Sequence, residues 1–117
     1  MGILEELLRD IPLPRMVKVR QHFHAPEIDD VASAVRRAIT EAGVLRRIAP
    51  GDRVAIAVGS RGVADIPTIV REVVRAIASV GGQPFLVPAM GSHGGATAAG
   101  QREVLESLGV TEAFVGA

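Results

Sequence analysis

Hydrophobic residues recur along this chain with helical spacing in four segments. Each segment gathers its apolar side chains on one side and its charged side chains on the other, as in an amphipathic helix packed on a core. Asp29 or Asp30 can cap the second segment, Pro67 suits the first turn of the third, and Thr97 can cap the fourth. The predicted helices cover residues 3–9, 29–42, 66–80 and 97–108.

Three other segments have the patterns of β-strands. In residues 16–23 valines alternate with basic residues, as in a half-exposed or edge strand. Val54–Val58 holds no polar residue, which predicts a strand covered on both faces of a parallel sheet. Phe85–Val87 predicts a third, short strand, and a fourth strand is expected at Phe114–Ala117.

The order of these elements predicts the fold class. Strands and helices alternate as β-α-β-α-β-α, a Rossmann-like order that favours a three-layer α/β/α fold with a small, mainly parallel sheet. The 117 residues suit a single α/β domain in which residues 1–14 form an N-terminal helix or arm. Three strands are few for a sheet with a wholly apolar middle strand. We therefore expect either the N-terminal part of a longer, two-domain protein or a domain that pairs with something else.

Composition narrows the classes of function. Aromatic residues make up only 3% of the chain, which disfavours base-stacking modules, and 13 basic residues balance 13 acidic ones. Neither nucleic acid nor an anionic membrane is therefore expected as a partner. Without cysteine the chain has no disulfide, thiolate metal site or cysteine nucleophile. With no apolar run of membrane-spanning length and no signal peptide, a cytoplasmic location is expected.

Two similar turns carry the candidate chemistry. Gly59-Ser60-Arg61-Gly62 follows the second predicted strand, and Gly91-Ser92-His93-Gly94-Gly95 follows the third. Because ligands of open parallel sheets bind beyond the carboxyl ends of the strands, both turns are expected at one site. His93 can exchange a proton or ligate a metal, and Arg61 suits a carboxylate or phosphate. The candidate anion-binding residues are Arg61, Ser60, Ser92, Gly94, Gly95 and Thr97, the last three at the N-terminus of a helix.

A purely structural interpretation of the same turns stays open. Glycine-rich turns between strands and helices occur for geometry alone, and Ser60 and Ser92 are more often turn or cap residues than nucleophiles. The spacings of a serine-hydrolase elbow, a P-loop and a dinucleotide fingerprint are all missing from the sequence. His22 and His24 would share a face of a strand, but no third ligand stands near them in the sequence, so no metal site is predicted.

The two turns resemble the N-terminal domain of the lactate racemase-like family, the nickel-pincer nucleotide-dependent racemases and epimerases with their uncharacterised relatives. Residues 59–68 and 88–97 carry the resemblance, which extends from about Pro14 to Ala117. The family's first turn has an Asp-x-Thr-Arg motif: Arg61 matches its arginine, Ser60 replaces its threonine, and Val58 stands at the aspartate position. The family's second turn has a Gly-x-His motif, and His93 matches the histidine that acts as acid and base toward the substrate hydroxyl.

The resemblance implies racemisation or epimerisation of a 2-hydroxy acid by hydride transfer. A base removes the hydroxyl proton, the cofactor accepts hydride, and the planar keto acid takes the hydride back on either face. The family also needs a lysine and further histidines from a later part of the chain, whereas here the single lysine is Lys18 and no histidine follows His93.

We therefore expect this chain to supply one wall of a cleft for a 2-hydroxy acid or related carboxylate and to be inactive by itself. A nickel-pincer nucleotide is expected only in a full-length parent that adds a C-terminal domain. The alternative is a non-catalytic module that binds phosphate or carboxylate, or regulates. A third option is that both turns are structural and the protein works through assembly, for example as a homo-oligomer.

Overall fold

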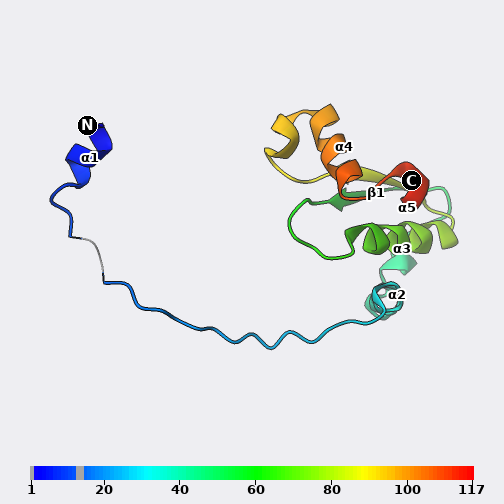
Figure 1. The fold of residues 1–117 in the computed structure, drawn as a ribbon. Helices are drawn as coiled ribbons and strands as arrows, with labels where there is room; N and C mark the ends of the chain where they lie inside the picture. Colours follow the sequence, from blue (N-terminus) through cyan, green and yellow to red (C-terminus); the bar gives the residue numbers. More distant parts are fainter. Residues whose placement is uncertain (1, 13–14) are drawn as a thin grey trace.

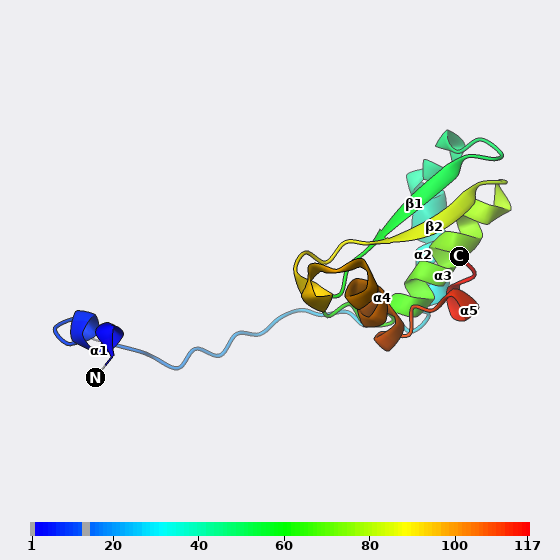
Figure 2. The same cartoon turned by 90° about the horizontal axis from the view of Figure 1, so that it is seen from above.

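The computed structural model describes residues 2–12 and 15–117, and its folded body starts at residue 31 (Figure 1). A long extended segment leads from this body to α1, which lies far from it in both views (Figures 1 and 2). The elements are α1 (Ile3–Leu8), α2 (Val31–Ala42), the 3-10 helix η1 (Val44–Arg47), β1 (Arg53–Val58), α3 (Ile66–Ser79), β2 (Gln83–Pro88), the 3-10 helix η2 (His93–Ala96), α4 (Ala98–Ser107) and α5 (Glu112–Val115).

β1 and β2 form a parallel, two-stranded sheet in the described part of the chain. Their register pairs Arg53 with Gln83 at one end and Val58 with Pro88 at the other. The connecting helix α3 lies below the sheet, and α2 packs on the far side of α3 (Figure 1). The expected α/β class with a small parallel sheet is therefore confirmed.

An aliphatic core fills the space between the sheet and the helices. Ile56 and Leu86 are paired neighbours on the face of the sheet that points toward it. The buried members of the core come from β1, α3, α4, α5 and the connecting loops: Val58, Val70, Val74, Met90, Leu105, Val110 and Val115. The core contains no aromatic side chain among these residues, as the composition predicts.

The opposite face of the sheet is open. Ala55 and Ala57 are exposed, and Val87 keeps 40% of its surface accessible. The expectation that Val54–Val58 is covered on both faces is therefore wrong for this chain, because α2 packs on α3 rather than across the sheet. A third layer is not formed by the described residues.

Two predicted strands are also absent from the described structure. Residues 16–23 are extended and exposed but pair with no strand. Residues 114–117 lie at the end of α5 and beyond it, where the Thr111 hydroxyl accepts a hydrogen bond from the Phe114 N–H at 3.3 Å. This cap closes a short helical turn at Glu112–Val115, so residues 114–117 do not extend along either edge of the sheet.

The predicted helices are confirmed with small changes at their ends. The Asp30 carboxylate caps α2 by accepting from the Ser33 N–H at 2.9 Å. Pro67 stands in the first turn of α3, and the Thr97 hydroxyl caps α4 by accepting from the Gly100 N–H. None of the helices in the described residues is both long and apolar enough to cross a membrane.

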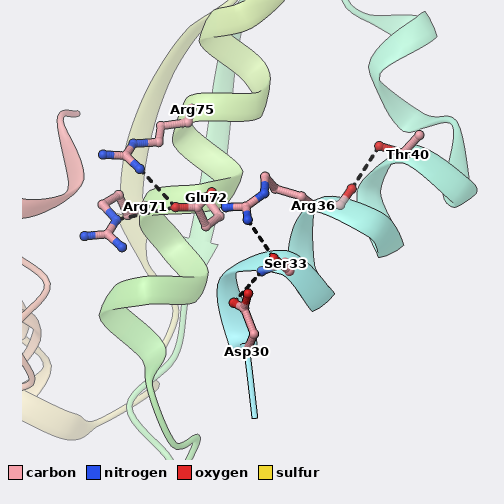
Figure 3. A network of polar contacts seen from close by, with 7 residues as sticks. All are labelled: Asp30, Ser33, Arg36, Thr40, Arg71, Glu72 and Arg75. Atoms are coloured by element: carbon pink, nitrogen blue, oxygen red, sulfur yellow. Dashed lines mark hydrogen bonds and ion pairs between the residues drawn. The ribbon is translucent and has the colours of Figure 1, made fainter. Parts of the chain in front are cut away.

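A buried carboxylate joins α2 to α3 (Figure 3). Only 3% of the Glu72 side chain is accessible, and its oxygens face Arg36 Nη1 at 2.7 Å, Arg75 Nη1 at 3.1 Å and Arg71 Nε at 3.5 Å. The hydrogen bond from Arg36 holds the pKa of Glu72 below its ordinary value, although burial acts in the opposite direction. The ionised carboxylate is therefore part of the packing between the two helices.

Candidate functional site

The two glycine-rich turns lie side by side at the carboxyl ends of β1 and β2. The Ala89 N–H donates to the Val58 carbonyl at 2.8 Å and extends the pairing past the strand ends. Between the turns lies an open cleft of about 540 Å³. It is lined by Gly59, Ser60, Arg61, Val63, Ile66, Ala89, Met90, Gly91, Ser92 and His93. The sequence-based expectation that both turns contribute to one cleft agrees with this arrangement.

A short hydrogen bond joins the two turns inside the cleft. Ser60 Oγ lies 2.6 Å from His93 Nδ1, and both side chains are half-buried. The His93 N–H also donates to the Met90 carbonyl at 3.3 Å, which fixes the backbone behind the ring. Since Nδ1 is engaged by Ser60, Nε2 is the ring nitrogen left for a ligand.

Cationic and apolar groups complete the lining. Arg61 is exposed at the edge of the cleft and forms no ion pair within the described part of the chain. Ser92 is exposed as well, and its hydroxyl does not cap η2. Met90 is buried and belongs to the core, so it packs beneath the cleft. The cleft thus combines a free guanidinium, two hydroxyls, an imidazole and an apolar floor.

The structure does not bring Gly94, Gly95 and Thr97 to this cleft, although the sequence suggests them as an anion cradle. The Thr97 hydroxyl donates to the Gly94 carbonyl and accepts from the Gly100 N–H, both at 3.1 Å, so its hydrogen-bonding capacity is used within the loop. A Cβ on Gly94 would lie 2.3 Å from the Gly100 carbonyl carbon. These residues therefore shape the loop that carries His93.

Val58 occupies the position at which the lactate racemase-like motif has an aspartate. Only 3% of Val58 is accessible, and the side chain belongs to the core. A carboxylate at this place would be buried among aliphatic groups. The first turn consequently brings Ser60 and Arg61 to the cleft, without an acidic partner at position 58.

The residues described do not fit a nickel-pincer cofactor. They bring together no cluster of three or more His, Cys, Asp or Glu side chains, and Lys18 lies in the exposed extended segment. His22 and His24 are exposed in that same segment.

Fold and site together define a small α/β domain with a loop-built cleft at the carboxyl end of a parallel sheet. No protein-family model, curated protein or solved structure matches the chain.

Sequence reasoning missed the direct bond between Ser60 and His93. The signal was present, because both residues occupy the same kind of turn after adjacent strands. What the sequence does not contain is the direction of the two side chains. The loop after His93 has a left-handed backbone, with φ of 62° at Gly94 and 66° at Gly95.

Proposed function

We propose that the cleft binds a 2-hydroxy acid or a related carboxylate and forms one wall of the active site of a lactate racemase-like racemase or epimerase. The observation that carries the proposal is the placement of Arg61, free of ion pairs in the described chain, in one cleft with the Ser60–His93 pair. A cleft of about 540 Å³ suits a small ligand. The open face of the sheet fits a three-layer, Rossmann-like arrangement if a further segment of a longer protein covers it.

In this proposal Arg61 holds the substrate carboxylate, because a guanidinium presents two parallel N–H donors to the two carboxylate oxygens. His93 Nε2 then faces the 2-hydroxyl group and accepts its proton as a general base. This role requires the tautomer in which Nδ1–H donates to Ser60 Oγ, since Nε2 must carry a lone pair. Ser60 is thus a positioning residue that sets the tautomer of His93.

The tautomer of His93 provides the first prediction. We expect ¹⁵N NMR of the neutral ring to show the proton mainly on Nδ1 in the wild-type chain and a marked shift toward Nε2 in Ser60→Ala. Ser92→Ala, which removes a hydroxyl from the same cleft without touching Nδ1, is the matched control and should leave the ring signals unchanged. Protonation mainly on Nε2 in the wild-type chain would contradict the base role.

Ligand binding by the 117-residue chain tests the proposed function itself. We expect isothermal titration to detect lactate binding, and Arg61→Gln to weaken it about tenfold or more, because the charged carboxylate loses its bidentate partner. Arg47→Gln, at an exposed arginine outside the cleft, should bind lactate like the wild type.

The hydroxyl group is tested by a second ligand. Propionate keeps the carboxylate of lactate and lacks its 2-hydroxyl group. It should therefore bind the wild type more weakly than lactate does, whereas His93→Ala should bind propionate and lactate with equal affinity. No racemisation of lactate is expected from the isolated chain. Lactate binding that survives Arg61→Gln, or that shows no preference over propionate, would overturn the proposal.

A non-catalytic anion-binding module is the second candidate, and the observation that favours it is the burial of Val58 at the family's aspartate position. Such a module would hold phosphate or a nucleotide through Arg61 without turnover. Titration with inorganic phosphate separates the two: phosphate binding without lactate binding supports the module.

A further inference from the structure

Residues 15–30, here called the N-terminal arm, form an extended segment without helix or strand, and all of their side chains are exposed. Val17, Val19 and Phe23 keep 79%, 81% and 75% of their surface accessible. In an extended chain these three share one side, while Lys18 and Arg20 share the other. An amphipathic strand sequence therefore stands in solvent without a partner strand.

The sheet has two edges, and the hydrogen bonds at its ends show which backbone groups they expose. The Gln83 and Ala89 N–H groups donate to the Asp52 and Val58 carbonyls, at 2.7 and 2.8 Å. In a parallel pair, N–H and C=O groups of alternate residues point to opposite edges. The backbone N–H and C=O groups of even-numbered residues in β1 therefore point toward β2, and those of odd-numbered residues in β2 point toward β1.

The backbone groups on the free edge of β2 are then those of Pro84, Leu86 and Pro88. Two of these three residues have no N–H group, so this edge is poorly suited to pair with another strand. The free edge of β1 belongs to Arg53, Ala55 and Ala57, each of which has both an N–H and a C=O group. Among the described residues no strand other than β2 pairs with β1, so these groups are open to a further strand.

We propose that residues 16–23 of one chain add as a strand to the β1 edge of a second copy, so that two chains exchange their N-terminal arms. The apolar row Val17, Val19 and Phe23 would extend the inward face of the sheet next to Ile56. A second copy is the occupant because the arm runs away from its own body (Figures 1 and 2). The Ala25-Pro26 step between the strand sequence and α2 favours extended backbone and keeps the arm outstretched.

Sedimentation velocity and amide exchange of the full chain test this proposal, which does not depend on the proposed function. We expect a dimer, with protection of the Ala55 and Ala57 N–H groups that rises with protein concentration. Val17→Asp with Val19→Asp should raise the dimer dissociation constant about tenfold or more. Ile28→Asp is the matched control, because Ile28 is an exposed apolar residue of the same arm outside the strand sequence.

A mixing experiment distinguishes the binding of an arm to a second chain from the binding of an arm to its own chain. Since the chain has no cysteine, His22→Cys provides a single site for a spin label. This spin-labelled chain should broaden the β1 amide signals of an added ¹⁵N-enriched chain that carries no spin label. A monomer at all concentrations would overturn the proposal. So would concentration-independent protection of Ala55 and Ala57, or a dimer that survives the double substitution.

Discussion

Replacing Gly94 with alanine is expected to lower the free energy of unfolding by about 3 kcal/mol. The new Cβ would lie 2.3 Å from the Gly100 carbonyl carbon and 2.5 Å from the Gln101 nitrogen, distances that force the backbone of α4 to move. The left-handed φ of 62° at Gly94 adds a cost for any residue with a Cβ. Urea denaturation of the purified variant measures the loss.

Gly95→Ala is the matched control. Its φ of 66° is nearly the same, but nothing lies within 4 Å of an added Cβ, so a loss of about 1 kcal/mol is expected from the backbone conformation alone. The difference between the two variants isolates the close approach of the loop to α4. Equal losses of unfolding free energy in both variants would show that the short distance between the loop and α4 has no effect on stability.

The contact between Gly94 and Gly100 also matters for the cleft. The loop from Gly91 to Thr97 is held by Gln101 Nε2, which donates to the Gly91 carbonyl at 2.7 Å, and by the Thr97 bonds to Gly94 and Gly100. His93 lies inside this clamped loop. The glycines that resemble a phosphate cradle in the sequence therefore act as a support that aims the imidazole at Ser60.

The helices that sequence patterns predict correctly have boundaries set by local partners. The α2 helix has its cap at Asp30 and its end at Gly43, and α4 has its cap at Thr97, so each boundary depends on residues within one turn. The core strand β1 is recognisable because five consecutive apolar residues indicate a buried position somewhere in a sheet.

The predictions that fail are those that need a distant partner. Alternation in residues 16–23 specifies a strand only if a sheet edge is available, and the described chain leaves this segment unpaired. The pattern of β1 cannot tell one covered face from two, because coverage depends on where α2 packs. Apolar spacing in α3 identifies Val70, Val74 and Ile77 but not Glu72, whose burial arises from the packing of α2.

Glu72 is the basis of the other large prediction. Glu72→Gln is expected to lower the free energy of unfolding by about 2 kcal/mol at pH 7, because Arg36, Arg71 and Arg75 lose their shared counter-ion. The loss stays below that of a fully buried pair, since the Arg36 and Arg75 side chains are 53% and 63% accessible and water can solvate them. Thermal or urea unfolding at several pH values measures it.

The pH dependence follows from the lowered pKa of Glu72 in the folded state. The carboxylate contributes its full stabilisation above the pKa that it has in the unfolded chain, about 4.3. That contribution disappears as the pH falls through the lower pKa of the folded state. The difference in stability between wild type and Glu72→Gln should therefore be constant near neutrality and shrink on acidification below about pH 4.

Glu103→Gln separates this effect from the general loss of one negative charge. Glu103 is exposed on α4, so its substitution should change the stability by less than about 0.5 kcal/mol. A Glu72→Gln variant as stable as Glu103→Gln would mean that the three arginines gain nothing net from the buried carboxylate, because its desolvation cancels their attraction. A difference that persists unchanged at low pH would instead point to packing of the side chain, because a charge effect must vanish when Glu72 is protonated.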